Sequence, residues 1–229
     1  MQVPGSHHAL STDAVVDAAL QLADADGLDA VTLRRLASKF GVTPMALYRH
    51  VRDKDHLLDL MASRLLEELD VATETESAWR DELRRLGNSF LALVAAHPAA
   101  PFLLSRPFES PGSQRVSEAL LGILDRAGFD PRDAVHLLQA LTGMLLGPAV
   151  HRATYAAAPA RKGSSGPSEP PGIAATAGGE RDWRVDQQAG WAAGPDSDRL
   201  VVELWVAGVE GLAAKQPRTR GGGGGGGED

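Results

Sequence analysis

The sequence predicts an all-α protein in which a three-helix head near the amino end precedes a larger helical bundle. Apolar residues recur at steps of three and four along most of the chain, and this spacing gives a helix one buried face. Capping residues and prolines suited to a first helical turn stand where these stretches begin. No stretch shows sustained two-residue alternation, which excludes a β-rich fold.

Length and composition agree with this fold class. The chain has 229 residues, enough for a small head and a larger body, and 43% of them are hydrophobic. It has no cysteine, which excludes disulfides, thiol catalysis and thiolate-bound zinc. No apolar run approaches the ~20 residues of a membrane span, and residues 1–8 lack the apolar core of a signal peptide. We expect a cytoplasmic protein with no membrane partner.

The head begins with one amphipathic helix. It is expected to end near Gly27 and to bury one face, made of Val15, Ala18, Ala19, Leu22 and Ala25.

A helix-turn-helix motif follows at residues 32–54. Two short helices cross tightly when the first offers a small residue, the turn accepts a left-handed backbone and the second returns a large apolar residue. Ala37, Gly41 and Leu47 meet these demands in order. Thr32 and Thr43 are expected to cap the two helices, with Pro44 at the first helical position.

The same segment carries a basic patch on an acidic chain, whose net charge is -7 and whose pI is about 5.5. Residues 34–54 hold six Lys and Arg residues against Asp53 alone, so they carry +5 and leave -12 for the remainder. This distribution favours a polyanion bound through one face, with an affinity that falls as salt rises. A solvated helical face is the alternative for the charges taken alone.

Residues 32–54, continued by His56, Leu57 and Leu58, closely resemble the tetracycline-repressor family of bacterial regulators. The most specific part is the run Leu47-Tyr48-Arg49-His50-Val51 followed by Lys54. The resemblance covers roughly residues 10–66, about a quarter of the chain. It implies an all-helical homodimer, usually a repressor, that leaves double-stranded operator DNA when a small molecule binds.

The resemblance also implies which residues meet DNA: Thr32, Arg34, Thr43, Pro44, Met45, Tyr48, Arg49, His50 and Lys54. By this resemblance Thr43, Tyr48, His50 and Lys54 hold phosphates, and Arg34, Met45 and Arg49 lie nearest the base edges. Arg34 is the strongest single candidate, because a guanidinium can form two hydrogen bonds with guanine. The alternative for Tyr48 is a half-buried hydroxyl that props the helix. The namesake opens its recognition helix with glutamine and proline, so Pro44 and Met45 predict a different operator.

The body continues the helical pattern. Asp53 is expected to cap a connecting helix toward residue 70, with one face made of Leu57, Leu58, Met61, Leu65 and Leu69. The next helix, stopped by Pro98, carries the stripe Trp79, Leu83, Leu86, Phe90, Leu93 and His97. A third, at about residues 113–127, is closed by Gly128 and turns Val116, Leu120 and Ile123 inward. Asp130 and Pro131 start a long helix, kinked at Pro148, that carries Val135, Leu138, Leu141 and Leu145.

The last third of the chain contains a loop and a helix. Residues 156–198 are rich in Ala, Pro, Gly and Ser and are expected to form a mobile loop. Two tryptophans in this segment, Trp183 and Trp191, leave two alternatives for it: a lid folded over the body, or a short helix. Asp196 or Ser197 is expected to cap a terminal helix that is apolar on nearly every side, through Leu200, Val201, Val202, Leu204, Trp205, Val206, Val209 and Leu212. Gly208 and Gly211 would permit a close subunit contact, and the resemblance implies a four-helix dimer bundle. The central helix of a monomer is the alternative.

These elements predict four segments. They are an arm at 1–10, the helix-turn-helix domain at 11–56, the ligand-binding and dimerisation domain at 57–215, and a Gly-rich tail at 216–229.

An apolar chamber is expected between helix 79–97, Phe102 to Leu104, and the helix at 137–151. Its candidate ligand contacts are Leu86, Phe90, His97, Phe102, Leu138, Leu141, Met144 and His151. His97 and His151 would be the polar anchors, and core histidines with satisfied hydrogen bonds are the alternative. The namesake holds its drug partly through a histidine-bound magnesium ion. Here Phe102-Leu103-Leu104 occupies that region, which favours a more apolar effector and no metal or cofactor.

The resemblance therefore implies a ligand-responsive DNA-binding repressor, and it motivates the hypothesis that the connecting helix transmits the signal. An enzyme is disfavoured, because the chain shows no repeated Glu-x-x-His pair, no nucleophile with a base partner and no phosphate loop. The alternative function is a dimeric DNA-binding protein that needs no effector.

Overall fold

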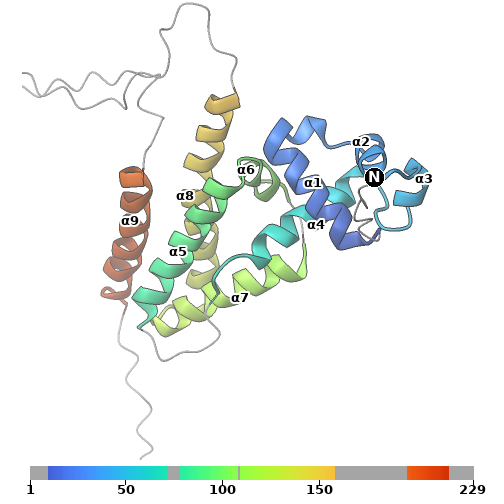
Figure 1. Ribbon diagram of the computed structural model, residues 1–229. Helices are drawn as coiled ribbons and strands as arrows, with labels where there is room; N and C mark the ends of the chain where they lie inside the picture. Colours follow the sequence, from blue (N-terminus) through green and yellow to red (C-terminus); the bar gives the residue numbers. More distant parts are fainter. Residues whose placement is uncertain (1–9, 72–77, 108, 158–194, 217–229) are drawn as a thin grey trace, which may run out of the picture.

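The computed structural model describes residues 10–71, 78–107, 109–157 and 195–216. These ranges contain α-helices, one 3-10 turn and no strand, which confirms the all-α prediction. The expected arm, the Gly-rich tail and most of the expected loop, with Trp183 and Trp191, lie outside the described residues. Figure 1 shows the head at one end of the molecule and the last helix at the other.

The head begins with α1 (Thr12–Asp26), which Ser11 caps and Gly27 ends with a φ of +83°. The 3-10 turn η1 (Leu28–Ala30) follows. Most of the expected face of α1 is buried or partly buried. Ala25 is the exception and is exposed, because in the last turn the buried position is Ala23.

The helix-turn-helix consists of α2 (Leu33–Phe40) and the short α3 (Pro44–Leu47). Gly41 adopts the left-handed conformation, with a φ of +66°, and Ala37 and Leu47 are buried at the crossing. The Thr32 hydroxyl caps α2 by accepting from the Arg35 amide. Thr43 holds the cap position of α3 without a side-chain hydrogen bond, so Pro44 at the first position sets the start of this helix.

Helix α4 (Lys54–Glu67) joins the head to the body. The Asp53 carboxylate caps it by accepting from the His56 amide at 2.7 Å. The expected leucine and methionine face is buried, although the helix ends at Glu67, ahead of Leu69. The helix packs against α1 in the head and against α6 and α7 in the body.

The body contains α5 (Trp79–Ala96), α6 (Ala100–Leu104), α7 (Pro111–Arg126), α8 (Pro131–Ala157) and α9 (Pro195–Ala213). The short helix α6 was not expected. Helix α8 continues past Pro148 to Ala157, and α9 begins before Asp196 and Ser197, which therefore lie in its first turn and not at its cap. Val135 is exposed, because the buried face of α8 runs through Ala134, Leu141 and Leu145.

Helices α8 and α9 leave an apolar face uncovered. Leu200 and Leu204 of α9 are 63% and 61% exposed, and Met144 of α8 is 38% exposed. A Cβ atom added at Gly143, Gly147, Gly208 or Gly211 would have no atom within 4 Å. By length and composition alone, residues 131–154 of α8 could cross a membrane, with a mean hydropathy of 1.2. This criterion does not separate a membrane span from a helix that a second subunit covers.

Candidate nucleic-acid interface and ligand cavity

The outer surface of the helix-turn-helix carries the residues that the sequence singles out for DNA. Figure 1 places α3 at the tip of the head, away from the body. Met45 is 73% exposed and Tyr48 is 50% exposed, and Arg34, Arg49 and Lys54 are exposed as well. The exposed Met45 side chain stands on the same outer surface as these cations.

Five of the six cations of residues 34–54 divide into two groups. Arg35 pairs with Asp26, and Lys39 donates to the Gln21 side chain at 3.0 Å, so both tie α2 to α1. Within the described part of the chain, no carboxylate pairs with Arg34, Arg49 or Lys54. Their charge is therefore available to phosphates.

Two of the nine expected DNA residues also have partners within the head. The Thr32 hydroxyl serves as the α2 cap. His50 Nδ1 lies 3.5 Å from the Thr12 hydroxyl, at the start of α1, and its ring is partly buried. The half-exposed Tyr48 fits both a phosphate contact and a propping role.

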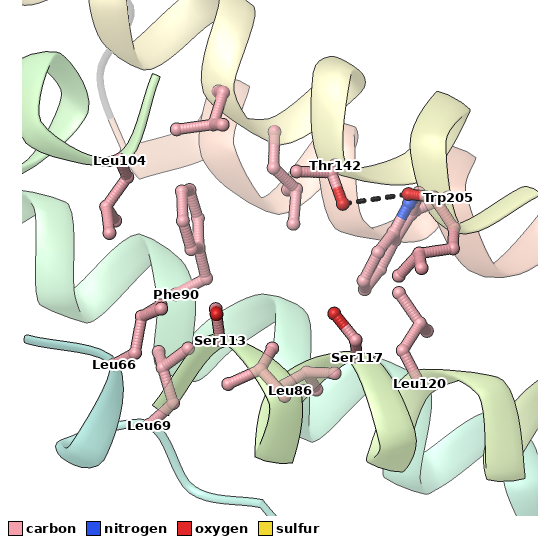
Figure 2. Close-up of a pocket in the computed structure, with 14 residues that line it drawn as sticks. Leu66, Leu69, Leu86, Phe90, Leu104, Ser113, Ser117, Leu120, Thr142 and Trp205 are labelled. Carbon is pink, nitrogen blue, oxygen red and sulfur yellow. Dashed lines mark hydrogen bonds between the residues drawn. The ribbon is translucent and has the colours of Figure 1, made fainter. Parts of the chain in front are cut away.

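A cavity of about 160 Å³ lies in the body between α5, α7, α8 and α9 (Figure 2). Its wall is Leu66, Leu69, Leu86, Phe90, Leu104, Ser113, Val116, Ser117, Leu120, Leu138, Thr142, Leu145, Leu146 and Trp205. None of these side chains is charged, and the hydroxyls of Ser113, Ser117 and Thr142 and the indole of Trp205 are its polar groups. The site suits a neutral, mostly apolar molecule.

The cavity includes three of the eight expected ligand contacts, namely Leu86, Phe90 and Leu138. Leu141 is packed in the core and Met144 is exposed, because α8 turns Leu138, Thr142 and Leu145 to the cavity. Phe102 and His151, which are partly buried, also lie outside the wall.

His97 lies elsewhere, at the junction of head and body. Its Nδ1 is 2.7 Å from Asp24 of α1, and its Nε2 is 3.3 Å from Glu68 at the end of α4. The expected polar anchor is therefore a structural link between three helices.

Helices α7 and α9 also contribute to the cavity wall, and none of their residues was among the expected ligand contacts. The α7 residues of the wall recur at helical spacing, so they share one face of the helix: Ser113, Val116, Ser117 and Leu120. Two hydroxyls therefore lie on the apolar face of α7. That pattern was a usable signal. The sequence held no signal that singled out Trp205 as a cavity residue, because the residues next to it on the terminal helix, Leu204 and Val206, are also apolar.

The cavity is connected to the head through α4 and α6. Leu66 and Leu69, at the end of α4, form part of the wall, and so does Leu104 of α6. Two residues beyond Leu104, the Arg106 guanidinium donates to Asp55 at 3.2 Å and to Asp59 at 3.4 Å, both on α4. The cavity wall thus includes a residue near the end of α4, and the ion pairs of Arg106 lie near the start of the same helix.

Ion pairs hold α9 against α5 beside the cavity. Arg84 donates to Glu203 at 2.9 Å, and Arg80 lies 2.8 Å from Glu210. Hydrogen bonding from the Arg84 guanidinium lowers the pKa of the exposed Glu203 carboxyl.

Comparison with known families gives two matches in sequence order. The family model for bacterial regulatory proteins of the tetR family matches residues 15–61. The model for the tetracyclin repressor-like C-terminal domain matches residues 72–171.

Individual relatives agree with these matches. The chain is 33% identical over 150 residues to the HTH-type transcriptional repressor DrrR1 of Streptomyces coeruleorubidus, covering 63% of this chain and 54% of DrrR1. It is 32% identical over 154 residues to the class D tetracycline repressor protein of Escherichia coli, covering 65% of this chain and 69% of that repressor. The matched part is thus little more than half of DrrR1.

Among solved structures, the fold is similar to that of the TetR family protein ActR of Streptomyces coelicolor in complex with actinorhodin. The TM-score is 0.66 at 24% identity, over 90% of this chain and 99% of ActR.

Proposed function

The chain belongs to the tetR family of bacterial regulatory proteins, and we propose that it is a dimeric, sequence-specific transcriptional repressor released from its operator by a small, largely apolar effector. The observation that carries this proposal is a shared element. Helix α4 opens with Lys54 on the basic surface, and Leu66 in its last turn and Leu69 just beyond its end lie in the cavity wall. The proposed DNA-binding domain is residues 11–56, and the proposed ligand-binding and dimerisation domain is residues 57–215. Family members are regulators and not enzymes, and a cytoplasmic location follows from a DNA target.

We assign roles on the DNA surface by exposure and charge. Lys54, Thr43, Tyr48 and His50 hold phosphates, and the contact of His50 with Thr12 orients its ring. Arg34, Met45 and Arg49 face the major groove and read base edges. No carboxylate of the described residues pairs with Arg34 or Arg49, which supports this assignment.

The proposed dimer forms through α8 and α9. Leu200, Leu204 and Met144 would leave water, and Gly143 and Gly208 would let helices of the two subunits approach closely. A glycine inside a helix costs about 0.5–1 kcal/mol relative to alanine, and a close contact between subunits would offset this cost at Gly143, Gly147, Gly208 and Gly211, which have open space beside them. The dimer would hold two recognition helices about 34–36 Å apart, one turn of DNA.

The proposed release mechanism is a tilt of α4. An effector that displaces Leu66, Leu69 or Leu104 would move α4 directly, and through Arg106 at Asp55 and Asp59. Because α4 packs against α1, the head would turn with it and the spacing of the two recognition helices would change. The second candidate, a DNA-binding protein without an effector, does not explain why an uncharged cavity adjoins the connecting helix.

The test has two parts. A duplex selected from a random pool should bind the purified chain more tightly than unselected duplex at moderate ionic strength, with one dimer on one site. Thermal-shift screening with neutral compounds of one or two rings should then yield a stabilising compound that weakens operator binding. Equal binding to all duplexes would contradict the regulator, and a stabilising compound without effect on DNA would favour the effector-independent alternative.

A further inference from the structure

The indole nitrogen of Trp205 is a buried hydrogen-bond donor that no group of the described residues accepts from. Trp205 is 2% exposed, and its Nε1 is fully covered. A buried donor without an acceptor is unfavourable, and such groups are rare in folded proteins. This one therefore requires an explanation.

The ring cannot readily turn to find an acceptor. It packs against Gly87 of α5, where an added Cβ atom would come within 3.2 Å of two ring carbons. Val202, one turn earlier on α9, also packs against Gly87: the same added Cβ atom would lie 3.1 Å from its Cγ2 atom. The absence of a side chain at Gly87 thus lets α9 press the indole against α5 and fixes its orientation.

The indole closes one end of the cavity (Figure 2). The nitrogen lies on the side of the ring that faces Thr142. The Thr142 hydroxyl already donates to the Leu138 carbonyl at 2.8 Å. The Thr142 oxygen can still accept or be shared, but the hydroxyl proton is committed to its own helix. No oxygen of the described residues, that of Thr142 included, is placed to accept from Nε1, so the donor remains without a partner.

We propose that the effector presents an acceptor oxygen, of the ketone or ether class, to the Trp205 Nε1–H, and that the rest of the molecule is neutral and apolar. This inference rests on the proposed function and specifies its ligand. The uncharged wall supports neutrality, because a charge buried without a partner is strongly disfavoured. Because Nε1 is covered in the structure, the atoms around it must shift to admit the acceptor oxygen. The bond then formed restores the missing hydrogen bond of a donor that has already lost its water, so the ligand gains more than from an exposed donor.

The size of the cavity narrows the class further. A volume of about 160 Å³ is close to that of a protein cavity of roughly 150 Å³ that holds benzene. The described conformation thus fits one aromatic ring with a short substituent. Trp205 is then the specificity-determining residue. Its N–H favours a ligand with an acceptor oxygen over a ligand of the same shape without one.

Two probes of equal shape test the proposal. Acetophenone carries a carbonyl oxygen where α-methylstyrene carries a methylene group. The dissociation constant of each is measured by calorimetry with the full chain and with the variant Trp205→Phe. The hydration difference between the probes cancels when their affinity ratio is compared between the two proteins. We expect Trp205→Phe to reduce the ratio of acetophenone to α-methylstyrene affinity about tenfold, as one hydrogen bond to a desolvated donor implies.

Phe90→Leu is the matched control, because it removes ring volume from the opposite part of the wall and no hydrogen-bond donor. It should change the affinity of both probes by the same factor. If Trp205→Phe also leaves the ratio unchanged, Trp205 only fills space and the proposal is overturned, while the effector function stands. If neither probe binds the wild-type chain, the proposal is overturned, while the thermal-shift screen decides the effector part of the proposed function separately.

A measurement on the unmodified chain guards against a variant that does not fold. The four tryptophan indole N–H resonances are followed by nitrogen-15 NMR and assigned by single changes to phenylalanine. Acetophenone should move the Trp205 proton downfield, as hydrogen bonding does, and α-methylstyrene should not. Equal shifts with both probes would overturn the proposal.

Discussion

The Nδ1 atom of His97 lies 2.7 Å from the Asp24 carboxylate and thereby joins the end of α5 to the first helix of the head. Asp24 also accepts from the Ala99 amide at 3.4 Å. Both side chains are about four-fifths buried, so this contact is shielded from solvent more than a surface ion pair. The link fixes the head against the body at a point that the cavity does not touch.

His97→Ala should lower the free energy of unfolding by about 1–3 kcal/mol, because it leaves the Asp24 carboxylate partly buried without this donor. Urea denaturation measures the change. A double-mutant cycle with Asp24→Ala isolates the pair, and the coupling should be about 1 kcal/mol or more. Additive effects of the two changes would show that the contact contributes nothing. Probe binding in the cavity should be retained.

A second link should transmit the effector signal. Arg106 holds Asp55 and Asp59 on α4 and lies two residues after Leu104, which lines the cavity. Arg106→Ala should preserve operator binding and effector binding when each is measured alone. The weakening of operator binding by a compound from the thermal-shift screen should fall by roughly 0.5–2 kcal/mol, a range typical of residues along a coupling route.

Arg132→Ala provides the comparison, since it removes an exposed arginine at the start of α8, away from α4 and α6. It should leave the coupling unchanged. Fluorescence anisotropy of labelled operator, with and without the compound, measures both variants. If the compound weakens operator binding of the Arg106 variant as much as that of the wild-type chain, Arg106 does not transmit the signal. The direct contacts of Leu66 and Leu69 with the compound would then carry it.

The two functional surfaces differ in how far the sequence predicts them. The helix-turn-helix could be located to the residue, because Thr32, Gly41 and Pro44 each impose a local backbone conformation. The cavity could be predicted only in part. Apolar residues surround α8, so its rotation, and with it the choice of Leu138 over Met144, depends on packing against α7 and α9. Likewise, the unpaired Trp205 donor arises only when α9 meets Gly87.

The uncovered face of α9 predicts a dimer that one charge disrupts. Leu204→Glu should convert the chain to a monomer in analytical ultracentrifugation at micromolar concentration, because a carboxylate would be buried between two helices without a partner. Gln114→Glu on α7 adds the same charge at an exposed site outside this face and should leave the dimer intact. A dimeric Leu204 variant would mean that the subunits meet elsewhere. Operator affinity should fall with dimerisation, since one head alone contacts half a site.

Base reading and phosphate binding should separate at Arg34 and Lys54. Arg34→Ala should cost about 1–3 kcal/mol on the selected operator and relax the preference at one position, because a guanidinium that bonds a base edge distinguishes that base.

Lys54→Ala removes a phosphate contact and should weaken selected and unselected duplexes alike. It should also reduce the slope of log affinity against log salt by about one. The two variants are therefore compared on both duplexes over a range of salt concentrations. Both side chains are exposed and pair with no carboxylate of the described chain, so neither change disturbs the fold of the head. An equal loss on both duplexes for both variants would mean that Arg34 contacts only the backbone and that sequence is read by Met45 and Arg49.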